Sequence, residues 1–262
     1  MQTQARDLIA QKDKNGGDRI AGVLATGPNG NMQIRAGLTI GADGRHSILR
    51  EKSGLKVKEL GAPFDVLWLS LPFKSGDPVD LVGRIQGGAF FVMICRGDYW
   101  QCAFGIPKGG FDTIRAEGIT GFDQVKLLTV AVNRLEQWAR HGLLMIGDAA
   151  HAMSPAGGVG INLAIQDAVA TANILGPVLL KSVPKLSDLK KVQKRRAFPT
   201  RIIQTFQLFV QNVMLAPTLR AKQTPKVPFV VRLLNAWPWA RQWPARLLGI
   251  GPRPEHVRLQ KR

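Results

Sequence analysis

The first forty residues alternate apolar and polar positions in short runs that end in turn sequences. Ala5–Ala10 and Arg19–Ala25 predict two short strands, and Met32–Ile40 predicts a third. Between them, Lys12–Asp18 and Gly27–Asn31 combine glycine with asparagine, aspartate or proline, which is typical of turns. The chain is therefore expected to open with a β meander.

A second strand-rich region follows in the middle of the chain. Phe64–Phe73 has the composition of a strand, and Ala89–Ile94 with Tyr99–Ile106 predicts a hairpin closed at Arg96–Asp98. We interpret that Arg-Gly-Asp as a turn and not as an adhesion motif. Val125–Val132 is also rich in residues that favour strands.

The pattern changes to a helical one in the last 120 residues. Gly142–Ile146 predicts a short buried strand, and Gly160–Leu180 predicts a helix. One face of that helix is expected to carry apolar residues at helical spacing: Ile161, Ala164, Ile165, Ala168 and Ala172. Residues 186–220 predict one or two more helices, broken or kinked at Pro199.

The composition is that of a globular protein. The 262 residues are 45% hydrophobic and 21% charged, enough for one large or two small domains. No apolar run reaches transmembrane length, and the N-terminus has no apolar signal-peptide core. Cys95 and Cys102 are too few for a disulfide scaffold, and we interpret both as packing residues. A reducing, cytoplasmic location is the default expectation.

The formal net charge of +18 is concentrated in the last third of the chain. Residues 1–180 carry 18 Lys and Arg against 16 Asp and Glu, whereas residues 181–262 carry 18 against two. Three interpretations stay open: solvated helix faces, peripheral contact of residues 228–251 with the inner face of a membrane, and nucleic-acid binding. The Trp and Arg mixture of residues 228–251 suits an anionic membrane surface. Nucleic-acid binding is the least favoured of the three, because the sequence contains no nucleic-acid-binding motif.

The segment with the most specific chemistry runs from Gly147 to Ala168. It reads as a strand end, an acidic turn, a glycine-rich loop and a helix start. Asp148 would accept hydrogen bonds from hydroxyls, and the glycines would let the backbone approach a ligand. A helix beginning near Gly160 would turn free N–H groups toward an anionic or electron-rich group. The plain alternative is a glycine-rich turn capped by an aspartate.

A second segment, GADGRHSILR at Gly41–Arg50, also follows a predicted strand and leads into a helix. Alone it is weak, because Asp-Gly is common in turns. Together, GADGRHSILR and GLLMIGDAAHAMSPAGGVGINLAIQDA resemble the two motifs of FAD-dependent aromatic hydroxylases, the flavoprotein monooxygenases of the p-hydroxybenzoate hydroxylase type. The resemblance covers roughly residues 5–180 and implies an α/β FAD/NAD(P)-binding fold with a β-sheet substrate domain and C-terminal helices.

The resemblance also implies roles for individual residues. Asp148, next to Gly147, would bind the ribityl chain of FAD, and Pro155 would lie beside the isoalloxazine ring. The pyrimidine edge of the flavin would be approached by Gly157, Gly160, Ile161 and Asn162. Asp43 and Gly44 would connect FAD with NAD(P)H recognition, helped by Arg50. The implied reaction is hydroxylation of an aromatic or other apolar small molecule with NAD(P)H and O2. A reductase on a related fold stays open.

The sequence departs from this family at its start. The strand–GxGxxG–helix unit that binds the ADP half of FAD has no counterpart here. We therefore expect an N-terminally truncated monooxygenase, divided into an FAD-domain remnant (1–55), a substrate-domain sheet (56–132), the second FAD-domain segment (133–182) and a basic helical region (183–262). The alternative is a non-catalytic remnant or subunit that binds a membrane or a partner chain through its basic C-terminus.

No side chain is assigned a catalytic role from the sequence, and no metal site is expected. His151 lies inside the second motif, where we interpret it as a residue that orients the loop. His46, His141 and His256 are isolated and lack metal-ligand spacing.

Overall fold

The computed structural model describes most of the chain as two compact units. The described residues are 2–12, 16–79, 81–86, 88–116, 125–155, 157–221, 229, 232, 236–237 and 242–258. The first unit combines residues 1–60, 132–204 and 245–262, and the second combines residues 61–131 and 205–244. The predicted division into four segments stays a prediction.

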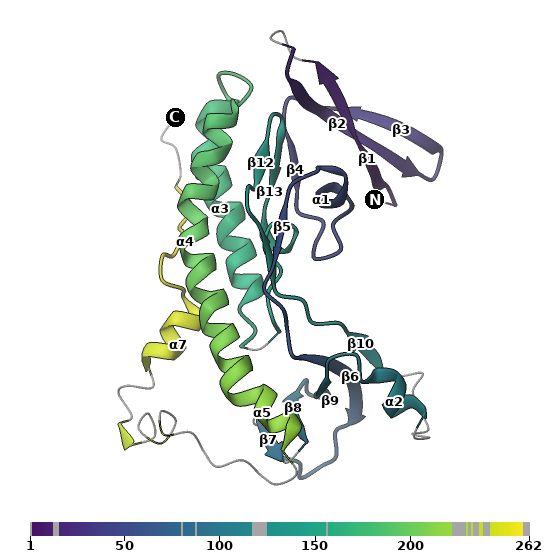
Figure 1. The fold of residues 1–262 in the computed structure, drawn as a ribbon, viewed down its shortest axis with the longest axis vertical. Coiled ribbons are helices and arrows are strands. Elements are labelled where there is room, and N and C mark those ends of the chain that lie inside the picture. Colours follow the sequence, from purple (N-terminus) through teal and green to yellow (C-terminus); the bar gives the residue numbers. More distant parts are fainter. Residues whose placement is uncertain are drawn as a thin grey trace. The chain divides into compact units, whose positions relative to one another are not determined.

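The meander predicted for the N-terminus is confirmed in the first unit. Strands β1 (Gln4–Lys12), β2 (Asp18–Gly27) and β3 (Gly30–Arg35) form an antiparallel sheet in that order (Figure 1). The third predicted strand was too long, because the chain leaves the sheet after Arg35. The Ala36 N–H still donates to Ala21, whereas the Thr39 N–H donates to Gly142 in another sheet.

That other sheet is the parallel core of the first unit. β4 (Thr39–Gly41) pairs in parallel with β13 (Leu143–Met145), which pairs antiparallel with β12 (Ala139–Arg140). All three residues of β13 are fully buried, as the sequence predicted for this strand. A short two-stranded pair, β5 (Val57–Glu59) with β11 (Asn133–Leu135), completes the strands of this unit.

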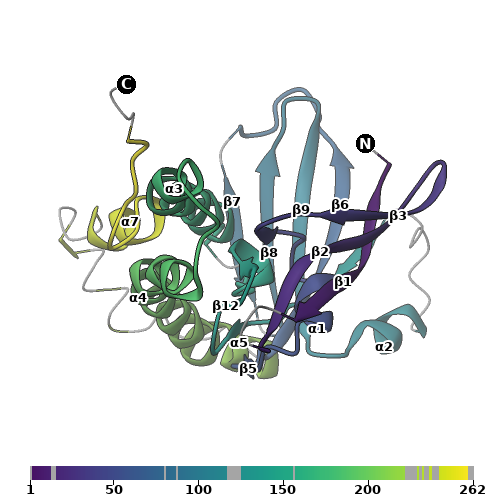
Figure 2. The same cartoon turned by 90° about the horizontal axis from the view of Figure 1, so that it is seen from above.

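Two long helices cover the parallel sheet. α3 (Gly160–Leu179) and α4 (Leu186–Val210) lie side by side in both views (Figures 1 and 2). Leu175 of α3 and Leu189 and Val192 of α4 pack in one core cluster with the residues of β13. Burial of these aliphatic side chains holds the helices on the sheet.

The buried face of α3 differs from the predicted apolar face. Ile161 and Ile165 are 73% and 57% exposed. The buried positions are Leu163, Asp167, Ala170, Thr171 and Leu175. This face includes a charged and a hydroxyl residue, so an apolar pattern alone could not identify it.

The helix is not broken at Pro199, because α4 continues through this residue, and a kink there stays a prediction. Proline inside a helix removes one backbone hydrogen bond and costs about 3 kcal/mol. Here Val192 and Ile203, on either side of Pro199, are buried in core clusters. The Thr200 hydroxyl also donates to the Arg196 carbonyl at 2.9 Å. Tertiary packing therefore outweighs the local preference of proline.

The second unit is built on an antiparallel sheet of five strands. Its order is β10 (Lys126–Leu128), β6 (Phe64–Pro72), β9 (Tyr99–Pro107), β8 (Ala89–Cys95) and β7 (Val82–Gln86). The predicted β8–β9 hairpin and its turn are confirmed, with the Arg96 N–H donating to Tyr99. Cys102 is fully buried, and burial raises the pKa of its thiol. This unit also contains α2 (Phe111–Ala116), a π-helical turn (Gln211–Leu215) and α5 (Ala216–Arg220).

The chain thus has the predicted mixed α/β architecture with helices toward its C-terminus. Much of the predicted membrane-contact segment, residues 228–251, lies outside the described residues; its described part includes α7 (Gln242–Gly249). Within the described ranges, no helix is both long enough and apolar enough to cross a membrane.

Candidate functional site

The acidic turn after β13 is shaped by a glycine. Gly147 begins a short 3-10 turn (Gly147–Ala149) with a φ of +58°. A Cβ on Gly147 would lie 3.1 Å from the Cβ of Ala164 in α3, so a larger residue would push the helix away. The turn therefore brings Asp148 close to the start of α3. The Asp148 side chain keeps 28% of its surface exposed.

The loop before α3 leaves the N-terminus of this helix open. Gly157 and Gly158 have φ values of +85° and +64°, which favour glycine. Val159 is the N-cap residue, and its apolar side chain accepts no hydrogen bond from the first turn of the helix. The first backbone N–H groups of a helix have no partner inside it. A 20-residue helix without an acidic first turn therefore presents unopposed donors and a positive dipole end.

The remaining predicted residues of this loop have mixed surroundings. Pro155 is half-buried, and its carbonyl accepts the Gly158 N–H at 3.0 Å. Asn162 is exposed but donates through Nδ2 to the Gly249 carbonyl at 3.2 Å. Of the predicted contacts to a ligand, Ile161 can offer its backbone N–H and an exposed side chain.

Asp43 of the second motif is engaged within its own loop. One carboxylate oxygen accepts the Ser47 hydroxyl at 2.5 Å, and the other accepts the Leu49 N–H at 3.2 Å. Asp43 thereby caps α1 (Ile48–Lys52), as does the Ser47 hydroxyl that accepts the Arg50 N–H. Gly44 has a φ of +83° and open space around it. A ligand-binding role for both residues stays a prediction.

Two arginines connect the motifs, and sequence reasoning missed the first of them. Arg45 approaches Asp148 with 3.7 Å between Nη2 and Oδ2. Arg50 donates to the Asp148 carbonyl at 3.5 Å and to the Arg45 carbonyl at 2.5 Å. The Arg45 Nη1 atom is buried and has no hydrogen-bond partner within the described part of the chain. A buried guanidinium nitrogen without an acceptor costs free energy, which an acceptor on a ligand would recover.

A buried network of charged and titratable side chains supports the acidic turn. Asp167 of α3 accepts the Gly147 N–H at 3.0 Å, contacts His151 Nε2 at 2.6 Å and accepts Arg196 Nε at 2.9 Å. All three side chains are fully buried. Burial alone would raise the pKa of Asp167, but the charge of His151 and the bonds from His151 and Arg196 lower it overall.

This network holds the His151 side chain in the folded core. The His151 ring packs against Trp138 in a tilted arrangement, with 4.9 Å between centroids and 38° between the ring planes. Arg196, which sequence reasoning also missed, extends the network to the Arg253 carbonyl at 3.0 Å. Because Asp167 binds the backbone of Gly147, the network fixes the turn that carries Asp148. The interpretation of His151 as a residue that orients the loop agrees with these contacts.

The open side of the turn has the donors and acceptors that a flavin requires. Asp148 can accept hydrogen bonds from ribityl hydroxyls, and the start of α3 can face the electron-rich pyrimidine edge. The unpartnered Arg45 nitrogen adds a donor on the same side as Asp148. The described residues of both motifs therefore fit the ribityl and isoalloxazine parts of FAD.

Comparisons with known proteins agree with this assessment. Residues 113–205 match the family described as the FAD binding domain. The chain is 30% identical over 245 residues to 6-methylpretetramide 4-monooxygenase of Streptomyces rimosus, which covers 84% of this chain and 58% of that protein. The chain thus spans little more than half the length of this relative.

Solved structures share the fold. OxyS anhydrotetracycline hydroxylase from Streptomyces rimosus matches with a TM-score of 0.70 at 21% identity, over 98% of this chain and 54% of that one. CabE, an aromatic hydroxylase from angucycline biosynthesis, matches with a TM-score of 0.71 at 18% identity, over 98% and 53%. These comparisons give no support to the alternative of a non-catalytic subunit.

Proposed function

This chain belongs to the FAD-dependent monooxygenases of the aromatic hydroxylase type, and on that premise we propose that it binds FAD and hydroxylates an aromatic small molecule. The observation that carries the proposal is the pairing of an open acidic turn at Asp148 with the uncapped N-terminus of α3. Asp148 lies 3.7 Å from Arg45, whose other terminal nitrogen is buried and has no hydrogen-bond partner among the described residues.

Each part of this site has one task. Asp148 accepts hydrogen bonds from the ribityl chain, and Arg45 donates to an acceptor of the bound cofactor. Gly157 and Gly160 allow the backbone to approach the ring, and Pro155 lies beside it. The positive end of the α3 dipole stabilises negative charge on the pyrimidine edge, which favours reduction. Asp43 and Gly44 hold the loop that presents Arg45.

Bound FAD supplies electron transfer and oxygen activation, which no amino-acid side chain provides. In the overall reaction one oxygen atom of O2 enters the substrate as a hydroxyl group. The other leaves as water, and NAD(P)H provides the two electrons. The chain's own contribution is to hold the cofactor in one orientation and to keep water away from it.

The substrate class follows from the relatives. Their names include a 6-methylpretetramide monooxygenase and an anhydrotetracycline hydroxylase. We infer a polycyclic aromatic compound of this kind. Peripheral membrane contact through residues 228–251 stays a prediction.

The proposal is tested with the full chain in two steps. FAD is titrated into the purified protein and followed by flavin fluorescence, and saturable binding is expected. NADPH or NADH is then added under air with anhydrotetracycline as the aromatic probe, and mass spectrometry in ¹⁸O2 should show one labelled oxygen in the product. A folded chain that takes up no FAD would contradict the proposal, as would an FAD-loaded chain that oxidises neither nucleotide.

A further inference from the structure

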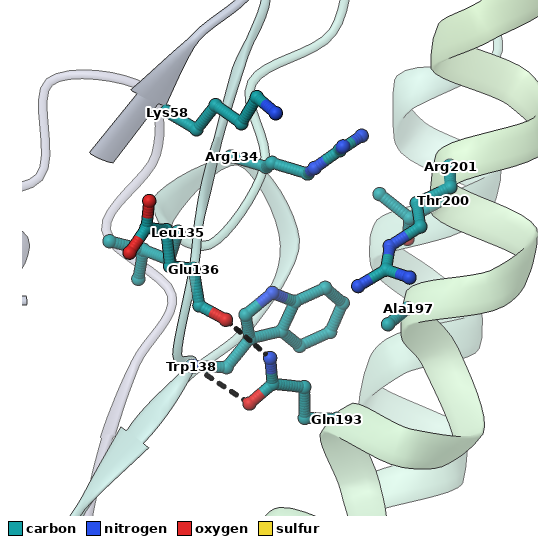
Figure 3. Close-up of a pocket in the computed structure, with 9 residues that line it drawn as sticks. All are labelled: Lys58, Arg134, Leu135, Glu136, Trp138, Gln193, Ala197, Thr200 and Arg201. Carbon is teal, nitrogen blue, oxygen red and sulfur yellow. Dashed lines mark hydrogen bonds between the residues drawn. The ribbon is translucent and has the colours of Figure 1, made fainter. Parts of the chain in front are cut away.

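A cavity in the first unit is lined by basic side chains. It is a cavity of about 220 Å³ between the strand pair β5–β11 and α4 (Figure 3). Lys58 comes from β5, Arg134 from β11 and Arg201 from α4. No residue of the two flavin motifs is among the residues that line it.

The positive charge of this cavity is not neutralised by the described residues. Across the described ranges, no carboxylate forms an ion pair with Lys58, Arg134 or Arg201. Arg134 Nη1 donates at 3.1 Å to Gln204, a neutral partner. Glu136 also lines the cavity, but its carboxylate points away from both guanidinium groups in Figure 3.

The two arginines oppose one another electrostatically. Burial lowers the pKa of Arg134, and the positive charge of Arg201 lowers it further. Like charges held near each other without a counter-charge are unfavourable, and an anion between them removes that cost. The arrangement therefore favours occupation by an anion.

The cavity has a rigid floor. Trp138 is 2% exposed, and its backbone N–H donates to Gln193 Oε1 at 3.0 Å. The Gln193 Nε2 donates in turn to the Glu136 carbonyl at 2.9 Å, so this amide is fixed in one orientation (Figure 3). A floor that these bonds already fix does not have to be ordered when a ligand binds, which reduces the entropic cost of binding.

Size and charge indicate the ligand class. Pockets for drug-sized ligands usually measure about 300–1,000 Å³, so this cavity suits a small group and not a polycyclic substrate. Arginine binds phosphate through two parallel hydrogen bonds, and lysine adds a point charge. We propose that this cavity, formed by Lys58, Arg134 and Arg201, binds a phosphate group of a soluble ligand. Free phosphate and the diphosphate of a dinucleotide present the same chemistry.

The experiment uses the full chain and inorganic pyrophosphate as the probe, measured by isothermal titration calorimetry. Saturable binding is expected, and Arg201→Gln and Arg134→Gln should each weaken it at least tenfold. The matched control is Lys181→Gln, an exposed lysine outside the cavity that should leave the affinity unchanged. Raising the salt concentration should weaken binding in the wild-type protein.

Two further readouts make the outcomes decisive. The unfolding midpoint shows whether each variant is folded, and Arg201 is exposed, so its substitution is not expected to disturb the fold. NADPH that displaces pyrophosphate would assign the site to a dinucleotide, and phosphate binding without displacement would assign it to another phosphate ligand. Wild-type protein without saturable binding, or variants that bind as tightly as the wild type, would overturn the proposal. FAD titration of the same variants is independent, because the flavin residues are different ones.

Discussion

Two aspartates of one sequence motif have opposite surroundings. Asp148 and Asp167 both belong to the Gly147–Ala168 segment. Asp148 is part of the turn Gly147–Ala149, and Asp167 binds the backbone of that turn from α3. Asp148 keeps 28% of its side chain exposed and has one contact to Arg45 at 3.7 Å. Asp167 is fully buried and binds Gly147, His151 and Arg196 at 3.0 Å or less.

This difference shows that Asp167 stabilises the turn, whereas Asp148 is the carboxylate that the turn exposes to a ligand. The Asp167 carboxylate accepts the backbone N–H of Gly147 and binds the side chains of His151 and Arg196. These contacts occupy its acceptor positions within the folded protein. Asp148 has acceptor capacity left on an open surface, next to an uncapped helix. A carboxylate can serve a ligand only where the protein has not already saturated it, and Asp148 meets that condition.

The largest expected effect on stability comes from breaking the buried network around Asp167. Asp167→Asn should lower the free energy of unfolding by about 3–5 kcal/mol, because it removes the nearer of the two carboxylates that pair with the buried Arg196 and leaves, among the described residues, only Glu255 at 3.7 Å. Chemical denaturation with urea measures this directly. Exchange of the exposed carboxylate in Glu51→Gln is the control and should change stability by less than about 0.5 kcal/mol. If Asp167→Asn were as stable as the wild type, the buried network would not hold the turn.

Arg45→Met tests the proposed cofactor contact on the exposed side of the turn, next to Asp148. The Arg45 contact to Asp148 is long and partly exposed, so stability should change by less than about 0.5 kcal/mol. FAD affinity should fall about tenfold or more, because one donor to the cofactor is lost. Flavin fluorescence titration measures this. Lys52→Met on the neighbouring helix is the control, and equal losses in both variants would argue against a specific role for Arg45.

Gly160→Ala separates helix stability from cofactor approach. A Cβ at this position would meet Met153 at 3.5 Å and Asp148 Oδ1 at 3.7 Å, which are ordinary contacts. Alanine also favours helices over glycine by up to about 1 kcal/mol. The variant should therefore be as stable as the wild type or slightly more stable, yet bind FAD more weakly because the methyl group meets the ring. Unchanged affinity would show that the flavin does not approach this residue.

Acid should weaken the buried network around Asp167. The pKa of Asp167 is lowered in the folded protein from its ordinary value of 3.8, so its stabilisation is complete above that value. It is lost as the pH falls from there through the folded pKa. Unfolding midpoints measured between about pH 5 and pH 2 should fall more steeply for the wild type than for Asp167→Asn. Parallel curves would contradict the assignment.

The sequence predicted the features that local patterns encode. The turn residues, the buried strand Leu143–Met145 and the two motifs were all identifiable from short segments. The end of the third strand at Arg35 was not, because Thr39 pairs with a strand about a hundred residues later in the chain. A break and a kink at Pro199 could not be told apart for a similar reason, because the packing of a whole helix, which outweighs one missing hydrogen bond, is not a local pattern.

The charged partners were harder to predict than the motif itself. Arg196 lies 29 residues after Asp167 on another helix, and no spacing rule connects them. Arg45 sits inside the GADGRHSILR motif, but only the structure shows its buried, unpartnered nitrogen. Two strands and a helix that are distant in sequence form the basic cavity. The sequence shows the basic residues but not that they lie close together in the fold.

The most direct measurement compares Asp148→Ala with Asp167→Asn in the same two assays, FAD titration and urea unfolding. Asp148→Ala should leave the free energy of unfolding within about 0.5 kcal/mol of the wild type. Its dissociation constant for FAD should rise by about tenfold or more, because hydrogen bonds to a charged group contribute about 1.5–3 kcal/mol. Asp167→Asn should show the large loss of stability. An Asp148→Ala chain that binds FAD as tightly as the wild type would contradict the account.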